Sequence, residues 1–266
     1  MDYFALDGSW WLPGSPDHRV TGTLTFSADG LTLVVYGSLV PQDANIGFAL
    51  ETQTISLYDQ GWFEGPQGLW EPTMIHELAH MWFGNSVAPW EWSDLWLNEG
   101  HASWYEFVFA EQNGQLEIDT ENWPDENGYA TVEALMEAIY AHGDEWRAEF
   151  GPVARPLSGD AATLFNFQMY HGGALVLYAL RQKVGARTFE RIEREWVKRY
   201  RDASARTADF IALASKVARR DLGRFLRDWL YGTTTPPMPG HPDWTVDPVQ
   251  EGVTAFALAR APAPKR

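Results

Sequence analysis

The chain has 266 residues with a globular composition, 45% hydrophobic and 21% charged, and is long enough to bury a sizeable core. It contains no cysteine, which excludes disulfides, thiolate metal ligands and cysteine nucleophiles. The formal net charge of −16 is uneven, because Arg19 is the only lysine or arginine before Arg147. An acidic first half repels polyanions and attracts cations, so nucleic acid is not expected as a partner, although the acidity also serves solubility.

The sequence shows no segment that predicts a membrane location. No apolar run is long enough to cross a bilayer. The first residues, MDYFALDGSWWLPG, lack the basic start and the sustained apolar stretch of a signal peptide. We therefore expect a soluble protein without a membrane partner, and the sequence leaves a cytoplasmic or an extracellular location open.

The N-terminal region predicts β-structure. Residues 21–26 and 31–36 are rich in alternating or β-branched residues and flank an SADG turn, which predicts a hairpin, and a short strand is expected near 38–40. Residues 46–58 alternate between apolar and polar, which predicts one edge strand.

The remainder of the chain predicts mainly helices. Pro72 suits a first helical turn, and Gly84 with Asn85 suits a stop, so we expect a helix from residue 72 to about 83. Further helices are predicted at 93–112, 131–142, 170–184, 188–202, 207–219 and 222–231. A β-rich start followed by a helical body defines the fold class as α+β, mostly helical with a small N-terminal β region.

A metal-binding motif lies in the first of these helices. His76 and His80 are four residues apart, so their imidazoles leave the same helix face one turn apart and can reach a single ion. Glu77 is placed to act as a base on a water at the open position of that metal. Glu99, after eighteen intervening residues, is the natural third ligand of a His₂Glu zinc site that binds one Zn²⁺.

A chance HExxH on a solvated helix is the alternative interpretation of this motif. The residues around it are apolar or small, so the helix is expected to be largely buried. Burying imidazoles and a carboxylate without partners would cost about 2–7 kcal/mol for each group. A bound metal removes that cost, which favours the functional interpretation.

The motifs together resemble the gluzincin zinc aminopeptidases, the family of alanyl aminopeptidase and the leukotriene hydrolase. The resemblance rests on HELAH, on WFGN at residues 82–85, on the eighteen-residue gap and on DLWLNEG at residues 94–100, and it extends from about residue 47 to 240. It implies a thermolysin-like metallopeptidase domain at 46–240. Residues 1–45 then correspond to remnant strands of an N-terminal β-domain, and residues 241–266 to a tail.

The resemblance also implies roles for residues outside the motif. GFALET matches the family's substrate-binding strand, so Gly47, Ala49 and Glu51 are expected to bind substrate, with Glu51 holding its free amino group. Tyr170 matches the tyrosine that donates to the oxyanion. Glu106 matches a carboxylate that orients a ligating histidine.

Each of these assignments has a structural alternative. Glu51 and Glu106 are also compatible with solvated carboxylates, and Tyr170 with a core tyrosine. His101 and His171 are expected to be structural or to support the ligands, because the His₂Glu set is already complete.

The predicted function is a zinc aminopeptidase that removes N-terminal residues from peptides with a free N-terminus. Glu77 would act as the general base, and Tyr170 would stabilise the oxyanion. Two alternatives stay open. One is a zinc endopeptidase with a relaxed N-terminal requirement, because the full β-domain that precedes the family's catalytic domain is missing. The other is a zinc-binding scaffold without catalytic activity.

Overall fold

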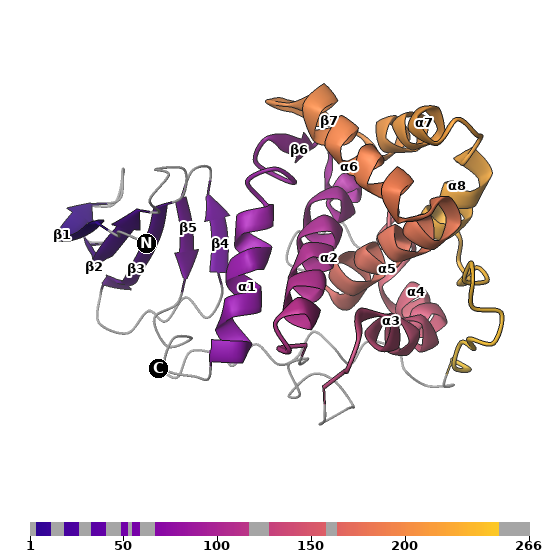
Figure 1. The fold of residues 1–266 in the computed structure, drawn as a ribbon, viewed down its shortest axis with the longest axis horizontal. Helices are drawn as coiled ribbons and strands as arrows, with labels where there is room; N and C mark the ends of the chain where they lie inside the picture. The colour runs from indigo at the N-terminus through magenta and orange to yellow at the C-terminus, as the bar shows by residue number, and fades with distance from the viewer. Residues whose placement is uncertain are drawn as a thin grey trace.

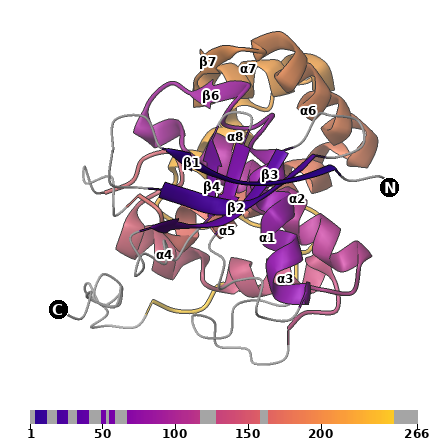
Figure 2. The same cartoon turned by 90° about the vertical axis from the view of Figure 1, so that its left-hand side faces the viewer.

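A sheet lies at one end of the molecule and a helical body at the other, with helix α1 between them (Figure 1). Seen from the sheet side, the strands stand in front of the helices (Figure 2). The computed structural model describes residues 49–52, 55–58, 67–116, 128–157 and 164–249, and the strands 4–11, 19–26 and 33–40. This arrangement confirms the expectation of a mostly helical chain with a small N-terminal β region.

The sheet has five strands in the order β1-β2-β3-β5-β4. Neighbouring strands are antiparallel except for the parallel pair β3–β5. Strand β4 is therefore an edge strand, and it lies beside α1 (Figure 1). The strands are β1 (Phe4–Trp11), β2 (Arg19–Phe26), β3 (Leu33–Val40), β4 (Ala49–Thr52) and β5 (Ile55–Tyr58).

The strand predictions need three corrections. Strand β1 was not predicted, because Asp7 and Gly8 interrupt its apolar residues. The two strands expected at 31–36 and 38–40 form the single strand β3, in which Gly37 pairs with Gly22 and the ladder continues across both glycines. The expected edge strand at 46–58 is a pair of antiparallel strands, β4 and β5. The predicted domain boundary at residue 45 thus falls between strands of one sheet.

Eight α-helices follow in the described part of the chain. They are α1 (Gln67–Ala79), α2 (Trp96–Gln112), α3 (Val132–Ala141), α4 (Gly143–Phe150), α5 (Phe167–Val184), α6 (Ala186–Tyr200), α7 (Thr207–Ala218) and α8 (Gly223–Tyr231). A small parallel pair, β6 (Val87–Pro89) with β7 (Ala203–Ala205), joins two loops of the body.

The helix predictions also need corrections. Helix α1 begins at Gln67, so Pro72 lies inside it and costs one backbone hydrogen bond instead of starting the helix. Helix α4 was not predicted, because four of its eight residues, GDEWRAEF, are charged. The structure buries Trp146 and Arg147 of this helix, and the Arg147 guanidinium donates to the carbonyl of Trp229 at 2.8 Å. The described residues after α8, as far as residue 249, contain no helix or strand.

Helices α2 and α5 approach each other closely at a pair of glycines. A Cβ atom on Gly173 would lie 2.8 Å from the Cα atom of Gly100, and a Cβ atom on Gly100 would lie 2.8 Å from the Cα atom of Gly173. Real Cβ atoms essentially never make contacts this short, so the contact requires glycine on both helices. It brings the start of α2, with Glu99, against the first turns of α5, with Tyr170.

A buried polar network fixes the start of α2 to α7. Asp94, in the 3₁₀ turn Trp92–Asp94 that precedes α2, accepts hydrogen bonds from the backbone N–H and the hydroxyl of Thr207 at 2.8 and 2.7 Å. The Trp96 indole donates to the same hydroxyl at 2.9 Å. Because Thr207 opens α7, this network ties the start of α2 to the start of α7.

No helix in the described ranges is both long enough and apolar enough to span a bilayer.

We expect Gly173→Ala to lower the melting temperature, because the added methyl must separate α2 from α5. Overpacking of this kind costs about 1–3 kcal/mol, measured as the free energy of unfolding in denaturant. Ala208→Leu, a larger addition at an exposed position of α7, should change stability little. Equal effects of the two substitutions would show that the glycine contact imposes no constraint.

Candidate metal centre

The two histidines of the motif leave α1 at its C-terminal end. His76 lies in the last turn, and His80 follows directly after Ala79, where its backbone N–H still bonds to the His76 carbonyl at 3.3 Å. The imidazole centroids are 4.7 Å apart and nearly perpendicular. The helical spacing read from the sequence therefore holds for both side chains, although the helix ends earlier than residue 83.

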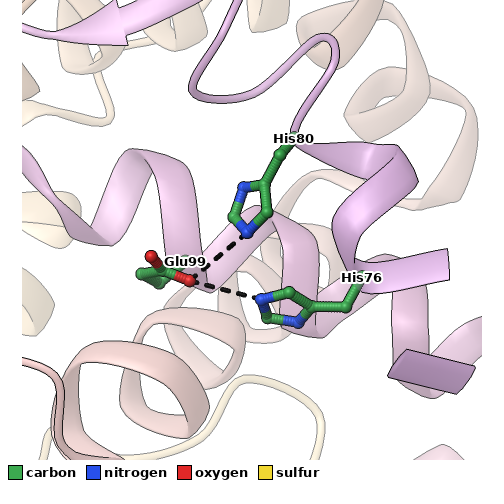
Figure 3. Close-up of side chains that lie close together, drawn as sticks. All are labelled: His76, His80 and Glu99. Carbon is green, nitrogen blue, oxygen red and sulfur yellow. Dashed lines mark hydrogen bonds and ion pairs between the residues drawn. The ribbon is translucent and has the colours of Figure 1, made fainter. Parts of the chain in front are cut away.

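Glu99, in the first turn of α2, faces both imidazoles (Figure 3). Its Oε2 atom lies 3.2 Å from Nε2 of His76 and 3.5 Å from Nε2 of His80. One ligand atom from each of the three residues lies within 4.8 Å of the other two. The structure thus brings together the three residues that the sequence predicted as zinc ligands.

The far nitrogen of each imidazole has its own partner, which fixes the tautomer. Nδ1 of His80 lies 3.0 Å from the carbonyl oxygen of Phe83, which can only accept, so Nδ1 carries the proton. Nδ1 of His76 lies 2.9 Å from the Glu106 carboxylate. In the neutral form of each ring the proton is on Nδ1, so Nε2, the atom that faces Glu99, can give its lone pair to a metal.

Burial and charge act in opposite directions on the ionisable groups of this cluster. Burial by itself raises the pKa of Glu99, but hydrogen bonds from His76 and His80 outweigh burial and lower this pKa to about 2. Burial lowers the pKa of His76, but hydrogen bonds to Glu106 and Glu99 raise it well above its ordinary value. Glu99 is therefore a permanent carboxylate, as a metal ligand must be.

Glu77 lies beside the cluster in a different environment. Burial raises its pKa to about 7, and the neighbouring histidines only partly oppose this shift. Its Oε2 atom is buried and has no hydrogen-bond partner among the described residues. A carboxyl group with a pKa near neutrality is suited to accept and return a proton.

A hollow of about 600 Å³ opens onto this cluster. Its walls include Glu51 and Ala49 of the edge strand β4, and Tyr170 and Phe165 from the region of α5. One oxygen each of Glu51 and Glu77 and one nitrogen of His80 lie within 4.8 Å of one another, so the Glu51 carboxylate faces the centre. Gly47, which was also predicted to bind substrate, lies outside the described residues.

The Tyr170 ring stacks on His76, with 5.8 Å between ring centroids. Burial and the nearby carboxylates of Glu99, Glu51 and Glu77 raise the pKa of Tyr170 above its ordinary range. The phenol therefore keeps its proton at neutral pH and can act as a hydrogen-bond donor in the hollow.

The other two histidines considered from the sequence, His101 and His171, are not part of the His76, His80 and Glu99 cluster. His101 is fully buried, stacks on Phe83, and pairs with Glu193 at 3.3 Å. His171 stacks on Phe107, and burial lowers its pKa to about 4. Neither belongs to a possible metal cluster in the described part of the chain.

Two asparagines of the site were missed from the sequence. Asn98 Nδ2 donates to the Glu51 carboxylate at 3.4 Å, and Asn85 Nδ2 donates to the Glu51 carbonyl at 3.1 Å. Both lie inside quoted motifs, NEG and WFGN, directly beside residues that were assigned roles. Their position within these motifs was the one available signal.

The donor set fits Zn²⁺. Two imidazole nitrogens and one carboxylate oxygen make up the three protein ligands typical of a catalytic zinc, which leaves a fourth position for water or substrate. The Nδ1 partners on both rings match the outer hydrogen bonds that ligating histidines make.

A helical body that carries a buried two-histidine, one-carboxylate centre defines the class of metal-dependent hydrolases with a HExxH helix. The chain belongs to peptidase family M1, because residues 45–229 match the Peptidase family M1 domain.

Similar proteins bear names of the same family. Aminopeptidase M1-B of Oryza sativa subsp. japonica is 30% identical over 159 residues, which is 59% of this chain and 17% of that protein. Aminopeptidase N of Streptomyces lividans is 31% identical over 160 residues, 59% of this chain and 18% of the relative. The chain therefore spans less than a fifth of the length of these relatives.

Solved structures agree in fold. A mutant M1 zinc metallopeptidase from Deinococcus radiodurans superposes with a TM-score of 0.57 at 27% identity, covering 75% of this chain and 40% of that one. A mutant from the same organism bound to a Tyr-Ser-Ala substrate gives 0.55 at 25% identity, covering 91% and 54%. These neighbours are zinc enzymes, and Zn²⁺ is accordingly the cofactor of the centre described here.

We expect zinc to stabilise the protein more strongly as the pH rises from 5.5 to 8. Hydrogen bonds to Glu99 and Glu106 raise the pKa of His76. Protonated His76 therefore stabilises the zinc-free protein at pH values below the pKa of histidine in the unfolded chain, about 6.5. This stabilisation is lost as the pH rises through the pKa of His76 in the folded protein. Zinc competes with protons for the imidazole nitrogens, so it binds most tightly at a pH where the imidazoles are deprotonated.

The measurement is the melting temperature with zinc and with chelator across that pH range. With free zinc about 1,000-fold above its Kd, the gap should reach roughly 8–16 °C at high pH. His142→Gln is the control, because it removes an imidazole that pairs with Glu145 and lies outside the metal centre. It should leave the increase of the melting-temperature gap with pH unchanged, whereas His76→Gln should abolish that increase. A gap independent of pH would contradict the ligand assignment.

Proposed function

We propose that this chain is the catalytic part of a zinc aminopeptidase that hydrolyses the first peptide bond of substrates with a free N-terminus. The observation that carries the proposal is the convergence of His76, His80 and Glu99, with Glu77 and Glu51 facing the same hollow. Family membership, relatives named aminopeptidases and a similar enzyme bound to a Tyr-Ser-Ala substrate support it. We further propose a thermolysin-like catalytic domain at 46–240, with the strands before residue 45 corresponding to part of an N-terminal β-domain.

His76, His80 and Glu99 would hold the zinc, which when bound polarises the scissile carbonyl and acidifies a water. Glu106 and the Phe83 carbonyl keep the two imidazoles in the ligating tautomer. Glu77 accepts the proton of the attacking water and passes it to the leaving amine, for which a pKa near 7 is well matched. The Tyr170 hydroxyl donates to the oxyanion that develops on the carbonyl.

Glu51 supplies the N-terminal selectivity in this proposal. Its carboxylate would pair with the substrate ammonium by a charge-assisted hydrogen bond. Because Glu51 faces Glu77 and His80 within 4.8 Å, an ammonium held there leaves room for about one residue before the reacting carbonyl. The register favours cleavage after the first residue.

We expect Glu77→Gln to reduce hydrolysis of amino-acid anilides by at least about 10²-fold, since a general base typically contributes 10²–10⁴-fold. Zinc content, measured by metal analysis, should stay at that of the wild-type protein because Glu77 is not a ligand. Substantial residual activity at full zinc occupancy would refute the role of base. An inactive wild-type protein with full zinc would favour the non-catalytic scaffold.

We expect Glu51→Ala to raise KM for amino-acid anilides by about 10–100-fold, as loss of a hydrogen bond between two charged groups costs about 1.5–3 kcal/mol. Hydrolysis of N-acetylated peptides should not change. Wild-type cleavage of the acetylated peptides at rates comparable to the free ones would favour the endopeptidase alternative. Equal effects of the substitution on both substrates would remove the anchoring role of Glu51.

A further inference from the structure

We propose that Asn98 is a positioning residue that holds the Glu51 carboxylate in the orientation that receives the substrate ammonium. The inference rests on the proposed aminopeptidase function, because Glu51 has a substrate to anchor only in that case. Asn98 occupies the first turn of α2, directly before Glu99, and is 7% exposed. Its role would be to link N-terminal selectivity to the metal centre through one helix turn.

The edge strand that carries Glu51 is held by the catalytic body at two points. Asn85, in the turn after α1, donates to the Glu51 carbonyl oxygen at 3.1 Å and so fixes the backbone. Asn98 donates to Oε1 of the same residue at 3.4 Å and so fixes the side chain. Strand β4 has four residues and one strand neighbour, β5, so these two contacts add restraint where the sheet itself offers little.

The chemistry of the contact suits an amide. A lysine or arginine here would neutralise Glu51, and an aspartate would repel it. The neutral Asn98 amide restrains the carboxylate and leaves its negative charge for an incoming ammonium. The described residues give the Glu51 carboxylate one hydrogen bond, the one from Asn98, so acceptor capacity is left over for a ligand.

The packing around the Asn98 amide favours the orientation in which its NH₂ group points at Glu51. Asn98 Oδ1 is buried and has no hydrogen-bond partner among the described residues, an arrangement that costs free energy. The oxygen lies against Gly84, where a Cβ atom would collide with it. Gly84 has a φ of +127°, so both its conformation and its lack of a side chain make space for the Asn98 amide. Rotating the amide would point its oxygen at the Glu51 carboxylate, which is repulsive.

The consequence is a fixed geometry between the two ends of the bound first residue. Asn98 sets the position of the amine anchor, and its neighbour Glu99 faces both histidines. Both lie in the first turn of α2, so the separation between the amine and the reacting carbonyl is set inside the catalytic body. Selectivity for a free N-terminus then requires no contribution from the strands before residue 45.

The test is a double-mutant cycle in the full 266-residue chain. Asn98→Ala and Asn98→Leu are each made in the wild-type and in the Glu51→Ala background, with Asn113→Ala, an exposed asparagine at the other end of α2, as the matched control. KM and kcat are measured for an alanine anilide and for an N-acetylated peptide. Zinc content is measured for every variant.

We expect both Asn98 variants to raise KM for the anilide by about three- to tenfold, with zinc content unchanged and hydrolysis of the acetylated peptide unaffected. In the Glu51→Ala background the same substitutions should have no further effect. Asn113→Ala should match the wild type.

Two results would overturn the proposal. One is an equal rise in KM with and without Glu51, and the other is loss of zinc without a change in KM, which would mean that Asn98 supports Glu99 instead. If the wild type hydrolyses no anilide, the proposed function fails separately. The role of Asn98 is then decided by calorimetry in the Glu77→Gln background, where Asn98→Ala should weaken binding of a free tripeptide but not of its acetylated form.

Discussion

The structure depends on one constraint, which is that both imidazoles of the motif are buried with Nδ1 already engaged. The Phe83 carbonyl and the Glu106 carboxylate take these two nitrogens, so Nε2 of each ring is the atom left to face Glu99. Without these partners each ring could rotate or change tautomer, and the two lone pairs would not converge. The turn that ends α1 just before His80 is part of the constraint, because it brings the Phe83 carbonyl back onto that ring.

Helix α2 carries the other half of the constraint. Glu99 and Glu106 lie seven residues apart and approach the two sides of the His76 ring. The start of the helix is fixed from outside by Asp94 and Thr207, and its contact with α5 is fixed by the glycine pair Gly100 and Gly173. Tyr170 lies near the start of α5, so the close approach of the two helices also places its phenol ring over His76. One helix therefore sets the positions of Glu99 and Glu106 and, through its contact with α5, that of Tyr170, the proposed oxyanion donor.

The sequence predicted those parts of the molecule that depend on local spacing. His76 and His80 were placed correctly because four residues make one helical turn, and Glu99 because its motif has a fixed form. The break between β4 and β5, the start of α1 ahead of Pro72 and the short helix α4 were not predicted, since no Gly, Pro, Asn or Asp separates the two strands, Pro72 itself favours a helix start, and half of α4 is charged. Asn98 was missed because a polar residue inside a motif has no periodic signal, and its partner Glu51 is 47 positions away.

The charge of the hollow links metal binding to the proposed selectivity. Four glutamates line it, Glu51, Glu77, Glu99 and Glu106, and no lysine or arginine is among the described residues of its wall. A divalent cation offsets Glu99 and Glu106, and the raised pKa of Glu77 lets that carboxyl share a proton near neutral pH. Glu51 is then the carboxylate left without a counterion. In the proposed function, an N-terminal ammonium would supply the missing positive charge, whereas an acetylated N-terminus would supply none, so the electrostatics of the centre would favour a free-amine substrate even before shape is considered.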